Sequence, residues 1–191
     1  SNNTGVGYNS LDHNTTGQEN VAVGYHCMDA NTTGNKNVAM GLDAMGARTG
    51  GERNTAIGNY AAADGASTGS YNTALGDNAN RELTTGDSNV AIGAQALYTE
   101  TTGGHNTAVG VNALFHQNGR SGQTAVGSGC FYTAPNLANS AGLGYQAGYS
   151  VTSGDELTLI GYQAGYNITT TSNHTCLGYY AGVNIQGGSA M

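Results

Sequence analysis

The sequence predicts an all-β protein, a parallel β-solenoid of eleven coils of 17 residues. Three observations predict it: a glycine recurs at a fixed period, a short alternation of β-branched and small residues precedes each glycine, and turn-forming residues fill the rest of each coil. The spacing between these anchor glycines is 17 residues, except for one of 18 between Gly58 and Gly76. The anchor glycines, interpreted as structural turn residues, are Gly7, Gly24, Gly41, Gly58, Gly76, Gly93, Gly110, Gly127, Gly144, Gly161 and Gly178.

The composition is unusual for a globular domain, and it argues against nucleic acid and membranes as partners. The 191 residues include 32 Gly, one Pro and no Trp, and only 9% are charged, against about 25% in a typical domain. The net charge is −7 with only five Lys and Arg, which disfavours binding to nucleic acid or to anionic membrane surfaces. No apolar run is long enough to span a membrane. We therefore expect a single repeat domain over residues 1–191, which begins inside a repeat and is a segment of a longer fibre.

The residues before each anchor glycine predict a short strand with the consensus N-[TV]-A-[VIL]-G. In a strand, alternate side chains share one face, so the aliphatic column and the Thr/Val column point the same way. We expect these two columns to face the core and the alanine column to face outward. The asparagine column is expected to form a hydrogen-bonded ladder, as repeated amides do in stacked strands.

The rest of each coil predicts a second strand and a loop. A small residue stands three positions after every anchor glycine, which favours a second short strand there. Thr-Gly stretches such as Thr15-Thr16-Gly17 indicate loops. The additional residue of the single 18-residue coil lies near Asp64 to Gly69, in such a loop, so the strands should remain in register. No stretch has helical periodicity.

An outward column of alanine predicts self-association, because small residues permit close approach of another backbone. We expect a homotrimer of parallel rolls. The alternative is that alanine lines a narrow corner of a monomeric solenoid.

The repeat resembles a known family. The pattern N-[TV]-A-[VIL]-G-x-x-A, as in Asn54–Gly58 with Ala61 and Asn89–Gly93 with Ala96, resembles the head repeats of trimeric autotransporter adhesins. The resemblance implies a left-handed parallel β-roll packed as a trimer. The 17-residue period is longer than is usual in that family. The Gly-Tyr-Gln-Ala-Gly-Tyr form of the last coils looks more like adhesin-head-like repeats in bacteriophage tail fibres. An extracellular or virion-surface location follows from either likeness.

No residue pattern predicts chemistry. The cysteines replace small residues of the repeat, and the two in one column are six coils apart, so buried free thiols are expected. The histidines occupy different coil positions, and no metal-ligand spacing or catalytic constellation is recognisable. The sequence therefore predicts no enzyme, no metal and no cofactor. The residues considered are Cys27, Cys130, Cys176, His13, His26, His105, His116 and His174.

The last coils concentrate tyrosine. Tyr145, Tyr162 and Tyr179 directly follow anchor glycines, and Tyr149 and Tyr166 lie five residues after them. One interpretation is a contact surface for a cell-surface glycan or protein receptor, because tyrosine combines an apolar ring with a polar tip. The other is a stack that stabilises the end of the solenoid or a subunit interface, and this second interpretation is favoured.

The function expected is a structural and adhesive fibre module, part of a phage tail fibre or bacterial surface adhesin that displays loops for host or surface attachment. One alternative is a self-assembling extracellular filament subunit that stacks end to end, since neither end shows a polar cap. Another is an ice-binding β-solenoid, suggested by the threonine column. Because that column shares a face with aliphatic residues, a core position suits it better than an ice-binding face.

Overall fold

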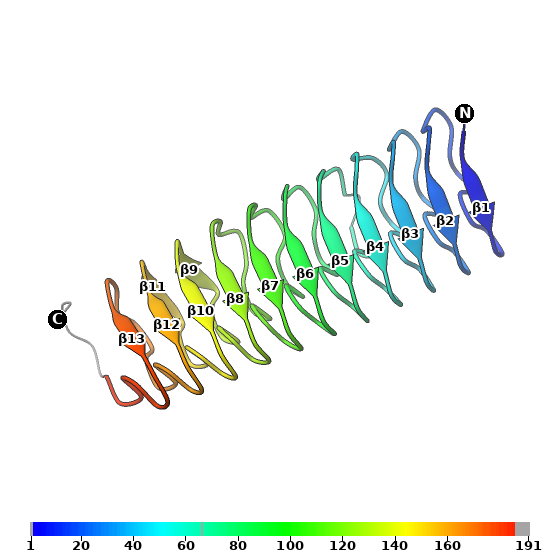
Figure 1. Ribbon diagram of the computed structural model, residues 1–191. Helices are drawn as coiled ribbons and strands as arrows, with labels where there is room; N and C mark the ends of the chain where they lie inside the picture. Colours follow the sequence, from blue (N-terminus) through cyan, green and yellow to red (C-terminus); the bar gives the residue numbers. More distant parts are fainter. Residues whose placement is uncertain (1, 66, 186–191) are drawn as a thin grey trace.

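The computed structural model describes residues 2–65 and 67–185, which form one rod of stacked coils with the first and last described coils at opposite ends (Figure 1). The described residues contain strands and turns and no helix, as predicted. Every strand is three residues long. The strands are β1 Thr4–Val6, β2 Val21–Val23, β3 Val38–Met40, β4 Thr55–Ile57, β5 Thr73–Leu75, β6 Val90–Ile92, β7 Thr107–Val109, β8 Thr124–Val126, β9 Asn136–Ala138, β10 Ala141–Leu143, β11 Ser153–Asp155, β12 Thr158–Ile160 and β13 Thr175–Leu177.

One parallel sheet runs the length of the rod. It has eleven strands in the order β1 to β8, then β10, β12 and β13, so each coil contributes one strand. Partner residues in neighbouring strands are one coil apart, for example Val90 with Thr107. Thr55 pairs with Thr73 across the longer coil, and the pairing then continues in the same columns. The predicted solenoid and its register are confirmed, with the additional residue accommodated between β4 and β5.

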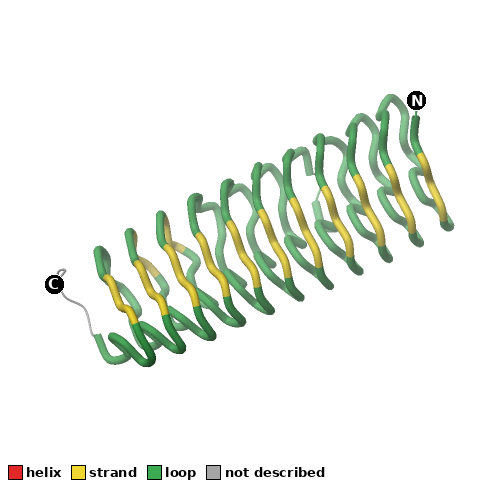
Figure 2. The backbone as a smooth tube through the Cα atoms, viewed as in Figure 1, coloured by secondary structure: helices red, strands yellow, loops and turns green. Residues whose placement is uncertain are grey.

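The predicted second strand after each anchor glycine is wrong, because these residues form turns. In the coil that follows β6, Gln95 and Leu97 have φ angles of 57° and 51°, in the left-handed region. Two left-handed residues so close together turn the chain sharply instead of extending it. The other strands in the described residues, β9 and β11, pair in parallel on the far side of the coil (Figure 2).

The anchor glycines of the stacked coils lie where the backbones of neighbouring coils approach closely. Gly93 has a φ of 127°, a conformation that L side chains rarely adopt, and a Cβ atom there would lie 2.6 Å from the carbonyl carbon of Gly110. The other anchor glycines have similar φ angles, between 123° and 146°. Glycine is therefore required at this position for two reasons: it can adopt the positive φ angle, and it has no Cβ atom to collide with the next coil.

The two faces of the sheet are reversed relative to the prediction. Ala91 is fully buried in the core, and so are its counterparts in the neighbouring coils, whereas the aliphatic column faces solvent, with Leu75 44% and Leu143 50% exposed. The interior is narrow on this face, and the one large residue of the alanine column, Leu159, fits because the facing turns carry Gly148 and Gly165, where a Cβ would lie 2.9 Å from Leu159 Cδ1. A Cβ on Gly142, in the alanine column, would lie 2.5 Å from Sγ of Cys130, in the small column after the anchor glycine. The two small columns therefore pack directly against each other across the coil.

Larger core side chains come from the turns and loops. Met45, Leu97 and Phe131 occupy the column four residues after the anchor glycine, and Leu83 and Ile168 lie three positions further along the coil. All five are buried within the coil. The core thus consists of small residues beneath the sheet and of larger apolar residues beyond them.

The asparagine ladder is confirmed. The backbone N–H of Asn89 donates to Oδ1 of Asn72 at 2.9 Å, and the same bond recurs from coil to coil between Asn3 and Asn106. Asn72 Nδ2 also donates to the carbonyl oxygen of Gly86 at 2.9 Å. Each amide therefore joins its strand both to the next strand and to a Thr-Gly loop, which satisfies backbone groups that are buried.

Candidate functional site

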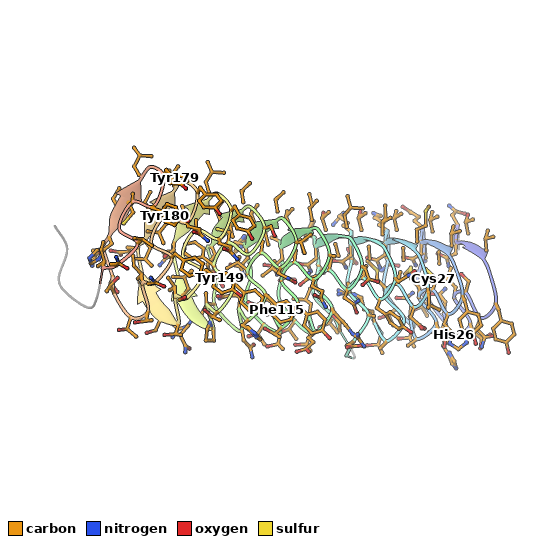
Figure 3. The ribbon with its side chains drawn as sticks, turned by 90° about the horizontal axis from the view of Figure 1, so that it is seen from below. His26, Cys27, Phe115, Tyr149, Tyr179 and Tyr180 are labelled. Atoms are coloured by element: carbon orange, nitrogen blue, oxygen red, sulfur yellow. The ribbon has the colours of Figure 1, made fainter. Side chains whose placement is uncertain are left out.

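The outer face of the eleven-stranded sheet is the most extensive candidate surface. It carries the aliphatic and Thr/Val columns, and neither column contains a charged residue. Its side chains project in a row along the rod in Figure 3. The aliphatic column comprises Val6, Val23, Met40, Ile57, Leu75, Ile92, Val109, Val126, Leu143, Ile160 and Leu177.

The size of this face indicates an interaction surface. Ten steps between strands, each about 4.8 Å, and a strand length of about 10 Å give the whole face, threonines included, an area of about 500 Å². Contiguous apolar surface of a few hundred Å² on a soluble protein often marks an interaction site. The aliphatic column is partly to largely exposed along this length and would be stabilised by a partner that removes it from water.

Three of the five candidate contact tyrosines form one exposed stack. The ring centroids of Tyr145 and Tyr162 are 5.4 Å apart, and those of Tyr162 and Tyr179 are 5.3 Å apart. Their side chains are 46%, 42% and 74% exposed. Because the interplanar angles are 17° and 18°, neighbouring rings cover each other's faces and present edges and hydroxyl groups outward.

The other two tyrosines belong to a second, longer stack. Tyr149 and Tyr166 stack at 5.2 Å, and the stack continues through Tyr132 and Phe115 to Tyr98. These rings are half-buried (Figure 3). Sequence reasoning missed Phe115, which also lies five residues after an anchor glycine. Counting Phe together with Tyr at this repeat position would have predicted its place in the stack. The guanidinium group of Arg81 lies 5.9 Å from the Tyr98 ring. Such continuous stacking supports a stabilising role for the rings.

A shallow groove lies beside this second stack. It has a volume of about 390 Å³, within the range of small-ligand sites. His116 borders the groove and packs edge-on against Phe115 and Tyr132. The groove was not predicted, because its lining comes from neighbouring coils. Its lining residues are Thr99, His116, Asn118, Thr133, Pro135 and Thr152.

The cysteines are buried and free, as predicted. Burial raises the pKa of the Cys27 thiol to about 11 and that of Cys130 to about 12. Since the thiolate is the nucleophile, both thiols are unreactive near neutral pH. These residues are core residues and do not contribute to a surface site.

Two charged side chains are also buried within the coil. Glu100 accepts hydrogen bonds from the N–H groups of Thr102 at 3.0 Å and Gly119 at 2.9 Å, and burial raises its pKa. Arg48 donates to the carbonyl oxygen of Gly69, and burial lowers its pKa to about 10. Both bind loop backbone from inside the coil, which is a structural role.

The chain was also compared with known proteins. No protein-family model, curated protein or solved structure matches it. Over the described residues, no helix has the length and apolar character needed to cross a membrane.

Proposed function

We propose that this chain is a structural and adhesive fibre segment that acts as a homotrimer of parallel solenoids, left-handed by its resemblance to adhesin heads. The observation that carries the proposal is the long, uncharged, solvent-facing aliphatic column of the eleven-stranded sheet. The same side chain chemistry recurs at the same place in each coil, so identical copies aligned in parallel would present matching columns to one another.

The proposed interface differs from the one expected from the sequence. The alanine column is buried inside the coil and is not accessible to a partner. The aliphatic and Thr/Val columns take its place as the surface that three copies would bury around a common axis. The trimer remains a proposal, now assigned to the opposite face of the strand.

The fibre would act by presenting its loops and surface side chains for attachment to a host or surface, and not by catalysis. Coil-to-coil hydrogen bonds hold the loops in place, as when Thr32 Oγ1 donates to the carbonyl oxygen of Thr49 at 2.8 Å. The groove beside His116 and the exposed tyrosine stack at Tyr145, Tyr162 and Tyr179 are the candidate contacts for a cell-surface glycan or protein receptor. A trimer would present each contact three times and gain avidity from weak individual interactions. The location proposed is extracellular or on a virion.

The oligomeric state tests this proposal. Sedimentation or light scattering should give a mass of about 58 kDa, three times the 19.3 kDa of one chain. Leu75→Asp places a charge on the proposed interface and should dissociate the trimer. Val111→Asp is a matched control, because Val111 is 48% exposed, against 44% for Leu75, but lies outside the strands. Circular dichroism should show that both variants keep their β structure. A monomeric wild-type chain, or equal behaviour of the two variants, would overturn the proposal.

An ice-binding solenoid is a second candidate, because one observation now favours it. The threonine column was expected in the core, but its members, such as Thr55 and Thr107, lie on the outer face. The sheet that carries them is regular and parallel (Figure 1). Since this is the surface that the trimer would bury, the two candidates exclude each other. A monomer that produces thermal hysteresis would support ice binding, and a trimer without hysteresis would support the fibre.

A further inference from the structure

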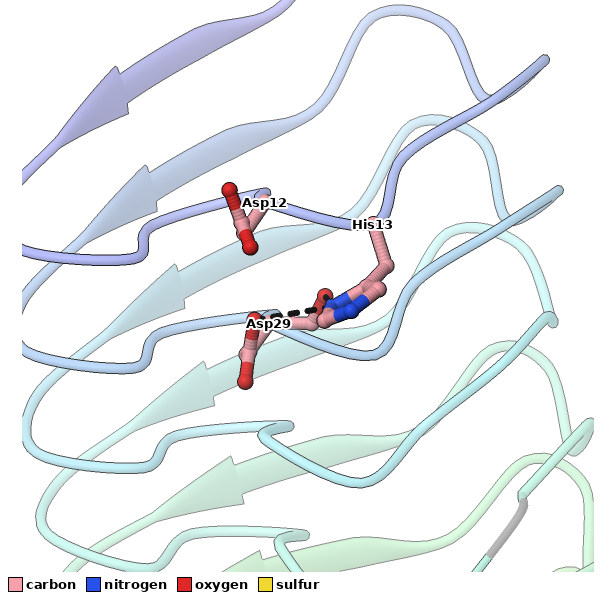
Figure 4. A group of neighbouring side chains, drawn as sticks. All are labelled: Asp12, His13 and Asp29. Carbon is pink, nitrogen blue, oxygen red and sulfur yellow. Dashed lines mark hydrogen bonds and ion pairs between the residues drawn. The ribbon is translucent and has the colours of Figure 1, made fainter.

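A cluster of metal-binding side chains lies on the first two coils, away from the outer sheet face. Asp12 and His13 follow β1, and Asp29 follows β2. One ligand atom from each of these side chains lies within 4.8 Å of the others. Figure 4 shows Asp12 and Asp29 on neighbouring coils, with the His13 ring extending toward Asp29. In the sequence Asp29 is one full coil away from Asp12, so no metal-ligand spacing is visible there.

We propose that Asp12, His13 and Asp29 bind a divalent transition metal of the Zn²⁺ class, which joins the first coil to the second. An imidazole nitrogen with two carboxylates is a donor set that zinc accepts, with water completing the coordination. Calcium and magnesium prefer oxygen ligands alone, so the imidazole disfavours them.

The spacing of the central pair suits such an ion. His13 Nδ1 and Asp29 Oδ1 are 3.1 Å apart. Bonds of about 2.0–2.1 Å in a tetrahedral site place two ligand atoms about 3.3 Å apart. A metal ion can therefore take the place of the contact between these atoms with little movement of either side chain. The Asp12 carboxylate is exposed, and one of its oxygen atoms lies within 4.8 Å of the other two ligand atoms.

The local charge also favours a cation. Asp12 and Asp29 occupy the same repeat position in adjacent coils, and like charges in this arrangement repel each other. The whole chain has only five Lys and Arg, with a net charge of −7. A divalent ion between the two carboxylates would turn this repulsion into attraction between coils.

The backbone holds His13 and Asp29 side by side, because the His13 N–H donates to the carbonyl oxygen of Asp29 at 3.1 Å. His26 lies nearby without a hydrogen bond to the cluster, since its Nδ1 is 3.9 Å from Asp29 Oδ2 and also 3.9 Å from Asp43 Oδ1. The backbone contact therefore keeps the two ligand-bearing coils in register before a metal binds.

Titration calorimetry with ZnCl₂ on the whole chain tests the proposal. The wild type should bind one Zn²⁺ per chain, and Zn²⁺ should raise its melting temperature. His13→Gln and Asp29→Asn should each weaken binding at least tenfold and remove the thermal shift. His105→Gln is the matched control, because His105 is an exposed histidine outside this cluster.

Two further measurements separate loss of metal binding from loss of folding, and zinc from calcium. Circular dichroism should show that the variants remain folded without metal, and CaCl₂ should give no comparable binding. No zinc binding by the wild type, zinc binding that survives His13→Gln, or equal binding of Ca²⁺ would overturn the proposal. Since binding is counted per chain, the outcome is independent of the oligomeric state.

Discussion

Oδ1 of Asn37 accepts two hydrogen bonds from Asn54, one from the backbone N–H at 2.9 Å and one from the side-chain amide at 3.0 Å. Both residues are buried, and one full coil separates them in the sequence. The pair shows how the rod is held together, because each buried amide satisfies the backbone of the following coil.

Asn54→Ala should therefore destabilise the protein by about 2 kcal/mol. The substitution removes the Oδ1 atom that accepts the Asn72 N–H at 2.9 Å and leaves that buried donor unpaired. Urea unfolding followed by circular dichroism measures the change. Asn59→Ala, at an exposed position in the same coil, should change the free energy of unfolding by less than about 0.5 kcal/mol. Equal effects of the two substitutions would contradict the ladder as a source of stability.

Gly93→Ala should prevent stable folding, with a loss of more than about 4 kcal/mol. The new Cβ would lie 2.6 Å from the Gly110 carbonyl carbon, which belongs to the backbone of the next coil and cannot move aside. Gly178→Ala is the comparison, since its φ is also positive, at 123°, but a Cβ there meets no atom within 4 Å. Backbone strain alone should reduce its stability by about 1–3 kcal/mol. Thermal melts of both variants measure the difference.

Phe131 and Gly148 should be energetically coupled. A Cβ on Gly148 would lie 2.5 Å from Cε1 of the buried Phe131 ring, so Gly148→Ala should overpack the core and cost about 1–3 kcal/mol. Phe131→Leu removes the clashing ring atoms. In a double-mutant cycle from urea unfolding, the double variant should be more stable than the sum of the single changes predicts, by about 1 kcal/mol. Strict additivity would show that the two sites relax independently.

Glu100 should make the protein less stable as pH rises. Burial raises its folded-state pKa above the ordinary value of 4.5, so the folded chain binds the proton more tightly than the unfolded chain. The stabilising contribution of protonated Glu100 to the free energy of unfolding is therefore fully present below about pH 4.5. It is lost as the pH rises through the folded-state pKa.

Glu100→Gln removes this titration and keeps a side-chain oxygen for the N–H groups of Thr102 and Gly119. Urea unfolding at pH 4 and pH 7 should show a smaller difference for this variant than for the wild type. Glu156→Gln, at an exposed glutamate, should retain the wild-type difference. A wild-type difference that persists in Glu100→Gln would assign the pH dependence to other groups.

Much of the fold follows from residues that recur once per coil. The anchor glycines and Asn20 to Asn106 mark the register, because a stacked strand repeats its environment in every coil. The aromatic stacks were partly predictable for the same reason, from Tyr145, Tyr162 and Tyr179. The groove at His116 and the cluster at Asp29 were not predictable, because the repeat pattern places their residues in the turns and loops of adjacent coils but does not show how those segments orient the side chains.

The sequence by itself determined the period, the positions of the eleven strands in the long sheet, their parallel register and the set of side chains that share each face of that sheet. It could not determine which face is inside, because a strict alternation is equally consistent with either orientation. The tertiary structure decided this through the width of the coil. Mostly small side chains fit between the sheet and the facing turns, as Cys130 and Gly142 show, and the larger Leu159 fits where the facing turns carry glycine. Ala91 therefore lies inside and Ile92 lies on the outer face.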